Sequence, residues 1–295
     1  MSVPTITPCL TYDRQAEEAV RLYVAAIPGS EILNVTRCGD KEPQPAGSVR
    51  TVRFTLGGQE LMAVNGGPPF TFTPAVSLFV HCETAAEVDA VWEPLADGGM
   101  VLMPLDEYPF ASRFGWVQDR FGVSWQVMVA PGRQRIVPGL LFVGERHGLA
   151  EEAINRYVSL FPESGVIDVR RYGDGGPEPA GTVEQARFSL GGYELSATES
   201  SLGHAFTFSQ GISFYVRCRT QAEIDRLWDG LRAGGTPQRC GWVVDRFGVS
   251  WQIAPAAAWE MVNDPDATRS QRVVDAILGM TKLDLETLKR AYAGQ

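Results

Sequence analysis

An internal repeat constrains the fold of this chain more than any other feature. Residues 115–126 read GWVQDRFGVSWQ and residues 241–252 read GWVVDRFGVSWQ, so the two segments differ at a single position. Shorter matches recur in the same order through both halves, among them RFTLGG at residues 53–58 and RFSLGG at residues 187–192. Because several matches in register do not arise by chance, the chain contains two copies of one domain in tandem.

The 295 residues of the chain agree with this organisation, since a domain commonly has about 150 residues. We expect a first domain over residues 1–131, a second over residues 132–256 and a helical extension over residues 257–295. The offset between matching residues is smaller at Asp119 than at Phe54. The second copy has therefore lost residues, and one of its strands is predicted to be shortened.

Helical and strand periodicities alternate within each copy. Thr84 is a residue type that caps helices, and Gly98 and Gly99 follow as a helix end. Within one copy, the order of one strand, one helix and three strands occurs twice, which is an α+β pattern. The elements expected in the first copy are helices over residues 16–27 and 85–96 and strands over residues 49–56, 60–64, 76–82, 100–105, 114–119 and 123–129.

The extension has the pattern of two amphipathic helices. Val273, Val274, Ile277 and Leu278 mark the first, and Asp284 is positioned to cap the second. Helices this short are marginal alone. We expect them to dock on the tandem domains or to cover a pocket mouth, with binding of a partner as the alternative.

Composition excludes several classes of protein. Hydrophobic residues make up 44% and charged residues 21% of the chain, which suits ordered cores. The net charge of −9 disfavours nucleic acid as a partner, and no apolar run is long enough for a membrane span. Residues 1–5 lack the pattern of a signal peptide, and the five cysteines lack C-x-x-C spacing. We therefore expect a cytoplasmic protein with reduced thiols.

The module of strand, helix and three strands, used twice per domain, resembles the vicinal oxygen chelate superfamily, which includes glyoxalases, bleomycin-resistance proteins and extradiol dioxygenases. DRFGVSWQ at residues 119–126 is similar to the PhnB-like branch, whose members often carry the name 3-demethylubiquinone methyltransferase-like. AEEA at residues 16–19, LGG at residues 56–58 and GMTKLD at residues 279–284 fit the same branch. The resemblance implies two tandem domains, each with two βαβββ modules that form a cupped mixed sheet around a ligand.

Metal-using members of that superfamily take His, Gln or Glu ligands from four strand positions. The resemblance places the first position near Pro8 and Pro138, and proline has no side-chain donor. The three histidines, at positions 81, 147 and 204, do not recur between the copies. His81 is expected at the surface near a strand end.

The remaining positions are also poor metal ligands. The fifth-strand position falls near Ser77 and Ser213, and serine binds divalent ions weakly without surrounding carboxylates. The last-strand glutamate is replaced by Gln126 and Gln252, whose amides bring no charge. We therefore expect neither a metal ion nor another cofactor.

Side-chain alternation identifies a candidate pocket on the cupped face. It would offer an amide, a hydroxyl, an aromatic ring and a cation to a small anionic or polar ligand. In the first copy, the ligand is expected to be held by Gln126, Ser77 and Arg53 against Phe79, and this copy is expected to carry the better pocket. The candidate ligand-binding residues are Arg53, Ser77, Phe79, Trp116, Gln126, Arg187, Ser213, Tyr215, Trp242 and Gln252.

Several of these residues have a structural alternative. Arg53 and Arg187 could instead pair with nearby carboxylates, and Trp116 and Trp242 could belong to the core. The Asp-Arg pairs that begin at Asp119 and at Asp245 are best explained by a turn.

Two functions from different classes remain open. The glycine pairs at 57–58, 66–67 and 175–176 lie in hairpin or loop contexts rather than after a strand as in a nucleotide-binding turn, so a methyltransferase gains no support from them. A hydrolase elbow is also missing from the sequence. Metal-independent binding or sequestration of a small molecule is ranked first. The alternative is an enzyme, either a metal-dependent glyoxalase- or dioxygenase-type enzyme or the methyltransferase that the family name implies. No catalytic residue is assigned. Because the two copies are joined in one chain, we expect them to pair with each other as an internal pseudo-dimer. The whole chain is then expected to be a monomer or a homodimer.

Overall fold

The computed structural model describes residues 5–39, 44–66, 70–132 and 135–295. The expectations for the N-terminal residues 1–4 and for Gly67 concern residues outside these ranges.

The first copy forms two modules, each a strand, a helix and three strands. Module 1 consists of β1 (Thr5–Tyr12), α1 (Ala16–Ala26), β2 (Glu31–Arg37), β3 (Val49–Leu56) and β4 (Gln59–Asn65). Module 2 consists of β5 (Val76–Cys82), α2 (Ala85–Ala96), β6 (Met100–Tyr108), β7 (Ala111–Gln118) and β8 (Ser124–Val129).

The second copy repeats this order. Its modules confirm the predicted α+β pattern and the predicted shortening, because β14 and β15 are much shorter than β6 and β7. Module 3 consists of β9 (Ile136–Val143), a 3₁₀ turn (Gly144–Arg146), α3 (Ala150–Leu160), β10 (Gly165–Arg171), β11 (Val183–Leu190) and β12 (Tyr193–Ser200). Module 4 consists of β13 (Ile212–Cys218), α4 (Gln221–Arg232), β14 (Thr236–Pro237), β15 (Trp242–Val244) and β16 (Ser250–Pro255).

The four modules form two eight-stranded mixed sheets, and each sheet combines one module from each copy. Sheet A has the order β14-β15-β16-β13-β1-β4-β3-β2 and joins module 4 to module 1. Sheet B has the order β10-β11-β12-β9-β5-β8-β7-β6 and joins module 3 to module 2. The central strands pair in antiparallel register, with Cys9 opposite Ser213 in sheet A and Ser77 opposite Gly139 in sheet B.

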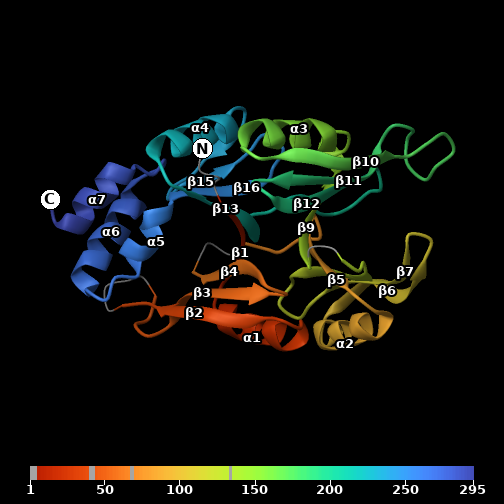
Figure 1. Ribbon diagram of the computed structural model, residues 1–295, viewed down its shortest axis with the longest axis horizontal. Coiled ribbons are helices and arrows are strands. Elements are labelled where there is room, and N and C mark those ends of the chain that lie inside the picture. The colour runs from red at the N-terminus through yellow and green to blue at the C-terminus, as the bar shows by residue number, and fades with distance from the viewer. Residues whose placement is uncertain (1–4, 40–43, 67–69, 133–134) are drawn as a thin grey trace.

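The helices cover the outer face of each sheet. In Figure 1, α3 and α4 lie above the strands, and α1 and α2 lie below them. Alternate strand residues point under these helices and form the core; Phe54, Trp125 and Trp251 are fully buried there. Thr84 caps α2, as predicted, by accepting a hydrogen bond from the Glu87 amide at 3.2 Å.

The repeated Asp-Arg-Phe-Gly turns are structural, as predicted. One carboxylate oxygen of Asp245 accepts backbone hydrogen bonds from Phe247 and Val249 at 2.9 and 3.0 Å. The other accepts from the Trp251 indole at 2.9 Å and the Tyr157 hydroxyl at 2.7 Å. Burial raises the pKa of Asp245, although these hydrogen bonds oppose the shift.

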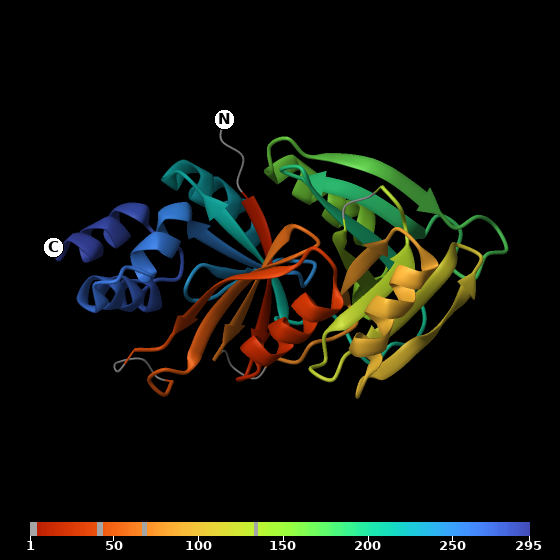
Figure 2. The same cartoon turned by 60° about the horizontal axis from the view of Figure 1, so that its bottom comes forward.

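The extension forms three helices: α5 (Ala256–Val262), α6 (Ala267–Gly279) and α7 (Leu285–Ala293). The predicted cap of the last helix is present, because Asp284 accepts from the Thr287 amide at 2.7 Å. The expected docking on the tandem domains is also observed, since Arg50 donates to the Val262 carbonyl and to Asn263. Figures 1 and 2 show the three helices at the end of the molecule formed by sheet A. In the described ranges, no helix has the length and apolar character to cross a membrane.

Candidate ligand-binding cups

Each sheet has a second face, opposite the helices of its modules, which we call cup A and cup B. In sheet B the helix-facing residues of β5 are Leu78 and Val80, so the alternate residues Ser77 and Phe79 face cup B. The candidate residues separate by sheet rather than by copy. Cup B contains Ser77, Phe79, Trp116, Gln126 and Arg187, and cup A contains Arg53, Ser213, Tyr215, Trp242 and Gln252.

This division corrects the expected pocket of the first copy. Arg53 lies on β3 in sheet A, whereas Gln126, Ser77 and Phe79 lie in sheet B, so these four residues cannot hold one ligand. Arg187 of the second copy lies in sheet B and lines a cavity with Phe79, whereas Ser77 and Gln126 are not among the residues that line it. Neither copy therefore carries a complete pocket by itself.

A serine and a glutamine are hydrogen-bonded at the floor of each cup. The Gln126 amide donates to Ser77 Oγ at 2.7 Å, and the Gln252 amide donates to Ser213 Oγ at 2.8 Å. In cup A, Cys9 lies beside this pair, and burial raises the pKa of its thiol to about 12. Burial likewise raises the pKa of Tyr215 to about 12. Both groups are therefore neutral near pH 7.

The two arginines face the cups and pair with nearby carboxylates, as the structural alternative predicted, while their role in ligand binding stays a prediction. Arg53 Nε donates to Glu60 at 2.9 Å. Arg187 donates from Nε to Glu194 and from Nη1 to Asp168, both at 2.7 Å. The hydrogen bond to Glu194 is the main cause that raises the pKa of Arg187. The edges of both guanidinium groups are thus occupied by protein carboxylates.

Cup B contains a cavity of about 320 Å³. Its apolar wall includes Phe79, Val137 and Met128, and Phe110 from the β6–β7 hairpin lies at its edge. Its polar wall includes Arg187 and Ser196. Ser196 is only 5% exposed, and its hydroxyl has no hydrogen-bond partner among the described residues. The sequence prediction missed the cavity residues His81, Phe110, Arg170, Gln185, Glu194 and Ser196.

His81 lies near the end of β5, as expected, and is partly exposed; it also lines this cavity, which was not expected. Alternation from Phe79 places it on the cup face, and this signal was available in the sequence. Glu194 and Ser196 could be found in the same way, from the strand that follows the Gly191–Gly192 turn. Their place beside β5 depends on pairing between the copies, which alternation does not reveal.

Cup A is covered by the extension. The ring of Trp259 on α5 lies over the Arg53 guanidinium, with 5.2 Å between Arg53 Cζ and the ring centroid. A polar cavity of about 610 Å³ remains between the β2–β3 rim and α5–α6, with Asn34, Thr36 and Asn263 in its wall. The extension therefore packs over cup A and forms one wall of this cavity, and its expected role as the cover of a pocket mouth stays a prediction.

The repeated tryptophans are not fully buried. Trp116 donates through its indole nitrogen to Ser124 Oγ at 2.7 Å. Trp242 instead packs against Phe70, with ring centroids 6.0 Å apart. Both lie on the cup faces, next to Gln126 and Gln252 respectively.

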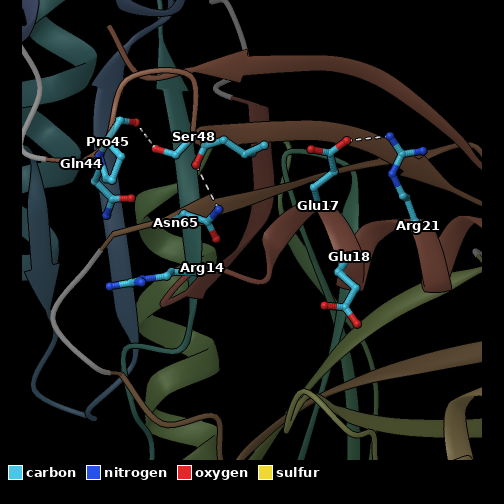
Figure 3. Close-up of a pocket in the computed structure, with 9 residues that line it drawn as sticks. Arg14, Glu17, Glu18, Arg21, Gln44, Pro45, Ser48 and Asn65 are labelled. Carbon is cyan, nitrogen blue, oxygen red and sulfur yellow. Dashed lines mark hydrogen bonds and ion pairs between the residues drawn. The ribbon is translucent and has the colours of Figure 1, made fainter. Parts of the chain in front are cut away.

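A further cavity, of about 450 Å³, lies outside both cups, between α1 and the segment before β3. Figure 3 shows that its contacts are internal to the fold: Glu17 pairs with Arg21, and Asn65 donates to the Val49 carbonyl at 3.0 Å. Asn65 also accepts from the Ala16 amide at 2.9 Å and so fixes the start of α1. We assign these residues to the structure rather than to a site.

The cups do not fit a transition-metal ion. In the described ranges, no group of three or more His, Cys, Asp or Glu side chains is placed to hold a metal. Pro8 and Pro138 are paired with Phe214 and Leu78 on the helix side, so the expected ligand position was displaced by one residue. The cup-facing residues there are Cys9 and Gly139: burial raises the pKa of the Cys9 thiol, which disfavours the thiolate that a metal needs, and glycine has no ligand group.

Among the described residues, the glycine pairs considered above lie between strands: Gly175–Gly176 is in the loop between β10 and β11, and Gly67 is outside the described ranges. Gly57–Gly58 and Gly191–Gly192 adopt positive φ values in the β3–β4 and β11–β12 hairpins.

Two sheets built from paired βαβββ modules define a protein with the vicinal oxygen chelate fold. The structure of glyoxalase I from Zea mays is similar in fold: the match covers 84% of this chain and 92% of the maize chain, with 10% identity and a TM-score of 0.54. The family model described as 3-demethylubiquinone-9 3-methyltransferase matches residues 4–128 and again residues 134–254, so the chain belongs to that family.

Single-domain proteins also match. The PhnB protein from Bacillus cereus shares 44% identity over 42% of this chain and 98% of its own, with a TM-score of 0.40. A protein from Pseudomonas aeruginosa shares 29% identity over 41% of this chain and 93% of its own, with a TM-score of 0.37. Comparison with curated proteins gives no match.

Proposed function

We propose that this protein binds a small molecule in cup B without a metal ion. The observation that carries the proposal is the cavity of about 320 Å³ between Phe79 of the first copy and Arg187 of the second. Ligand sites commonly combine an apolar lining with a few polar groups, and this cavity has both. Its volume is at the small end of the usual range of roughly 300–1,000 Å³.

The two enzyme alternatives gain no support from the side chains of the cups. A glyoxalase- or dioxygenase-type reaction needs a metal held by imidazole or carboxylate groups, and the described residues do not provide such a set. The methyltransferase activity in the family description would need a donor nucleotide, for which the glycine pairs are unsuited. Binding or sequestration requires only the shaped cavity.

The test is a thermal-shift screen of neutral, anionic and aromatic fragments, followed by titration calorimetry of the compounds that raise the Tm. We expect binding of unchanged affinity after treatment with EDTA. Loss of binding with EDTA, and its return with a transition metal, would contradict metal independence.

A variant that fills the cavity checks the location. Gln185→Trp places an indole at the cavity wall, and we expect it to abolish binding. Thr36→Trp places the same ring in the wall of the polar cavity beside cup A and should leave binding intact. Unchanged binding by a folded Gln185→Trp protein would place the ligand elsewhere.

A further inference from the structure

The protein supplies its own aromatic ring to one of the two cups. In cup A, the ring of Trp259 lies over the Arg53 guanidinium, at 5.2 Å. Arg53 is held at its edge by Glu60. A guanidinium whose edge is bound to a carboxylate keeps its planar faces available for stacking on an aromatic ring. Cup A therefore shows which kind of group this arrangement accepts.

Cup B repeats the arrangement without the ring. Arg187 occupies the position of Arg53, and Glu194 that of Glu60, as the matching β-hairpin registers show. Glu194 and Asp168 occupy two edges of the Arg187 guanidinium. In the described part of the chain, no aromatic ring lies over Arg187, which instead lines the cavity.

One substitution between the cups adds a polar contact. Met62 is opposite Arg53 in cup A, whereas Ser196 is opposite Arg187 in cup B. The Ser196 hydroxyl is buried and unpartnered in the described residues. A buried hydroxyl without a partner is costly, so a ligand with a matching polar group would recover that cost. In cup A, the residue at this position is the apolar Met62, which offers no hydrogen bond.

The β6–β7 hairpin adds apolar surface at the cavity edge. Phe110 is 53% exposed and lies against Tyr108 and Phe114, with ring centroids 5.4 and 5.0 Å away. Exposed aromatic rings at a cavity mark a surface that a ligand can cover. The second copy has no equivalent, because its hairpin is reduced to β14 and β15.

We infer that cup B takes a neutral, planar aromatic compound that stacks on Arg187 and hydrogen-bonds to Ser196. The inference rests on the proposed function and specifies its ligand class. Anionic compounds are disfavoured, because Glu194 and Asp168 pair with Arg187 and would repel a third carboxylate, and the other arginine of the cavity, Arg170, pairs with Glu184. The polar substituent on the ring is a hydroxyl or carbonyl group, which a serine hydroxyl can bind.

Calorimetry with three compounds of similar size tests this class on the unchanged protein. The compounds are 2-naphthol, its saturated analogue decahydro-2-naphthol, and 2-naphthoate. We expect 2-naphthol to bind at least about tenfold more tightly than either of the others, as a stacking contact and charge repulsion predict. Equal affinities for the three would overturn the inference.

Variants identify the contacts. Arg187→Lys keeps the positive charge next to the carboxylates but removes the planar guanidinium. We expect it to weaken the binding of 2-naphthol by about tenfold. Ser196→Ala should weaken 2-naphthol by about fivefold and leave naphthalene unaffected. The control is Arg120→Lys, which removes the same group from its contact with Phe121 outside the cups and should change neither affinity.

The outcomes separate this inference from the proposed function. If decahydro-2-naphthol binds as tightly as 2-naphthol and Gln185→Trp abolishes both, the cavity is a binding site and the aromatic class is wrong. If a naphthol binds equally well to the Gln185→Trp variant, both statements are wrong. If Arg187→Lys does not fold, the Ser196→Ala variant and the comparison of the three compounds still test whether the ligand is a neutral aromatic compound.

Discussion

Ser77 of the first copy lies directly opposite Gly139 of the second, in the antiparallel pairing of β5 with β9. Because Gly139 has no side chain, the ring of Phe79 can lie over it; a Cβ there would come within 2.5 Å of that ring. The two copies thus build the floor of cup B together, and Cys9 and Ser213 join them in the same way in cup A.

The shared sheets make the two copies interdependent. We expect the whole chain to be a monomer of 32.2 kDa by light scattering, because both pairings are made within it. Residues 1–131 produced alone should oligomerise or remain unfolded, since their modules lack the strands that complete each sheet. A folded monomer of that half would contradict the pairing.

Removal of Trp259 should expose cup A. We expect Trp259→Ala to lower the free energy of unfolding by about 1–3 kcal/mol, because packing and the contact with Arg53 are lost. Added indole should raise the Tm of this variant more than that of the unchanged protein, by refilling the space. The double variant Trp259→Ala with Arg53→Met should lose the extra response; a retained response would mean that indole binds elsewhere.

Asp245 is expected to be a stability determinant rather than a site residue. In Asp245→Asn, the amide nitrogen cannot accept the hydrogen bonds of Tyr157 and Trp251, so both buried donors lose their acceptor. Chemical denaturation should show a loss of about 2–4 kcal/mol. Tyr157→Phe, which removes one donor and leaves the carboxylate, should cost less than the asparagine variant; an equal or greater cost would contradict this assignment.

The contribution of Asp245 should also depend on pH. Burial raises its pKa above the ordinary 3.8, so its stabilising contribution is complete below that value and declines as the pH rises through the raised pKa. The difference in unfolding free energy between the unchanged protein and Asp245→Asn should therefore shrink with rising pH. A difference that grows with pH would show that the carboxylate is stabilised in its ionised form.

Local structure was predictable from the sequence because its signals are local. The cap at Thr84, the cap at Asp284 and the turn at Asp119 each depend on neighbours within a few residues. Side-chain alternation also assigned Ser77 and Gln126 to one face, and the structure joins them by a hydrogen bond.

Pairing between strands could not be predicted in the same way. The copies have equivalent edge strands, so periodicity is equally compatible with pairing inside a copy or between copies. For this reason Arg53 was grouped with Gln126, although Arg187 is the arginine of that cup. Helix α5 was missed because its seven residues directly follow a strand, so the role of Trp259 was not foreseen.

The most direct test of a site shared between the copies is calorimetric titration of the intact chain with 2-naphthol, using one variant from each copy. Phe79→Ala changes the first copy, and Arg187→Lys changes the second. We predict a single binding event per chain that both variants weaken. Two independent events, of which each variant removes one and leaves the other, would show that each copy carries its own pocket and would contradict the shared cup.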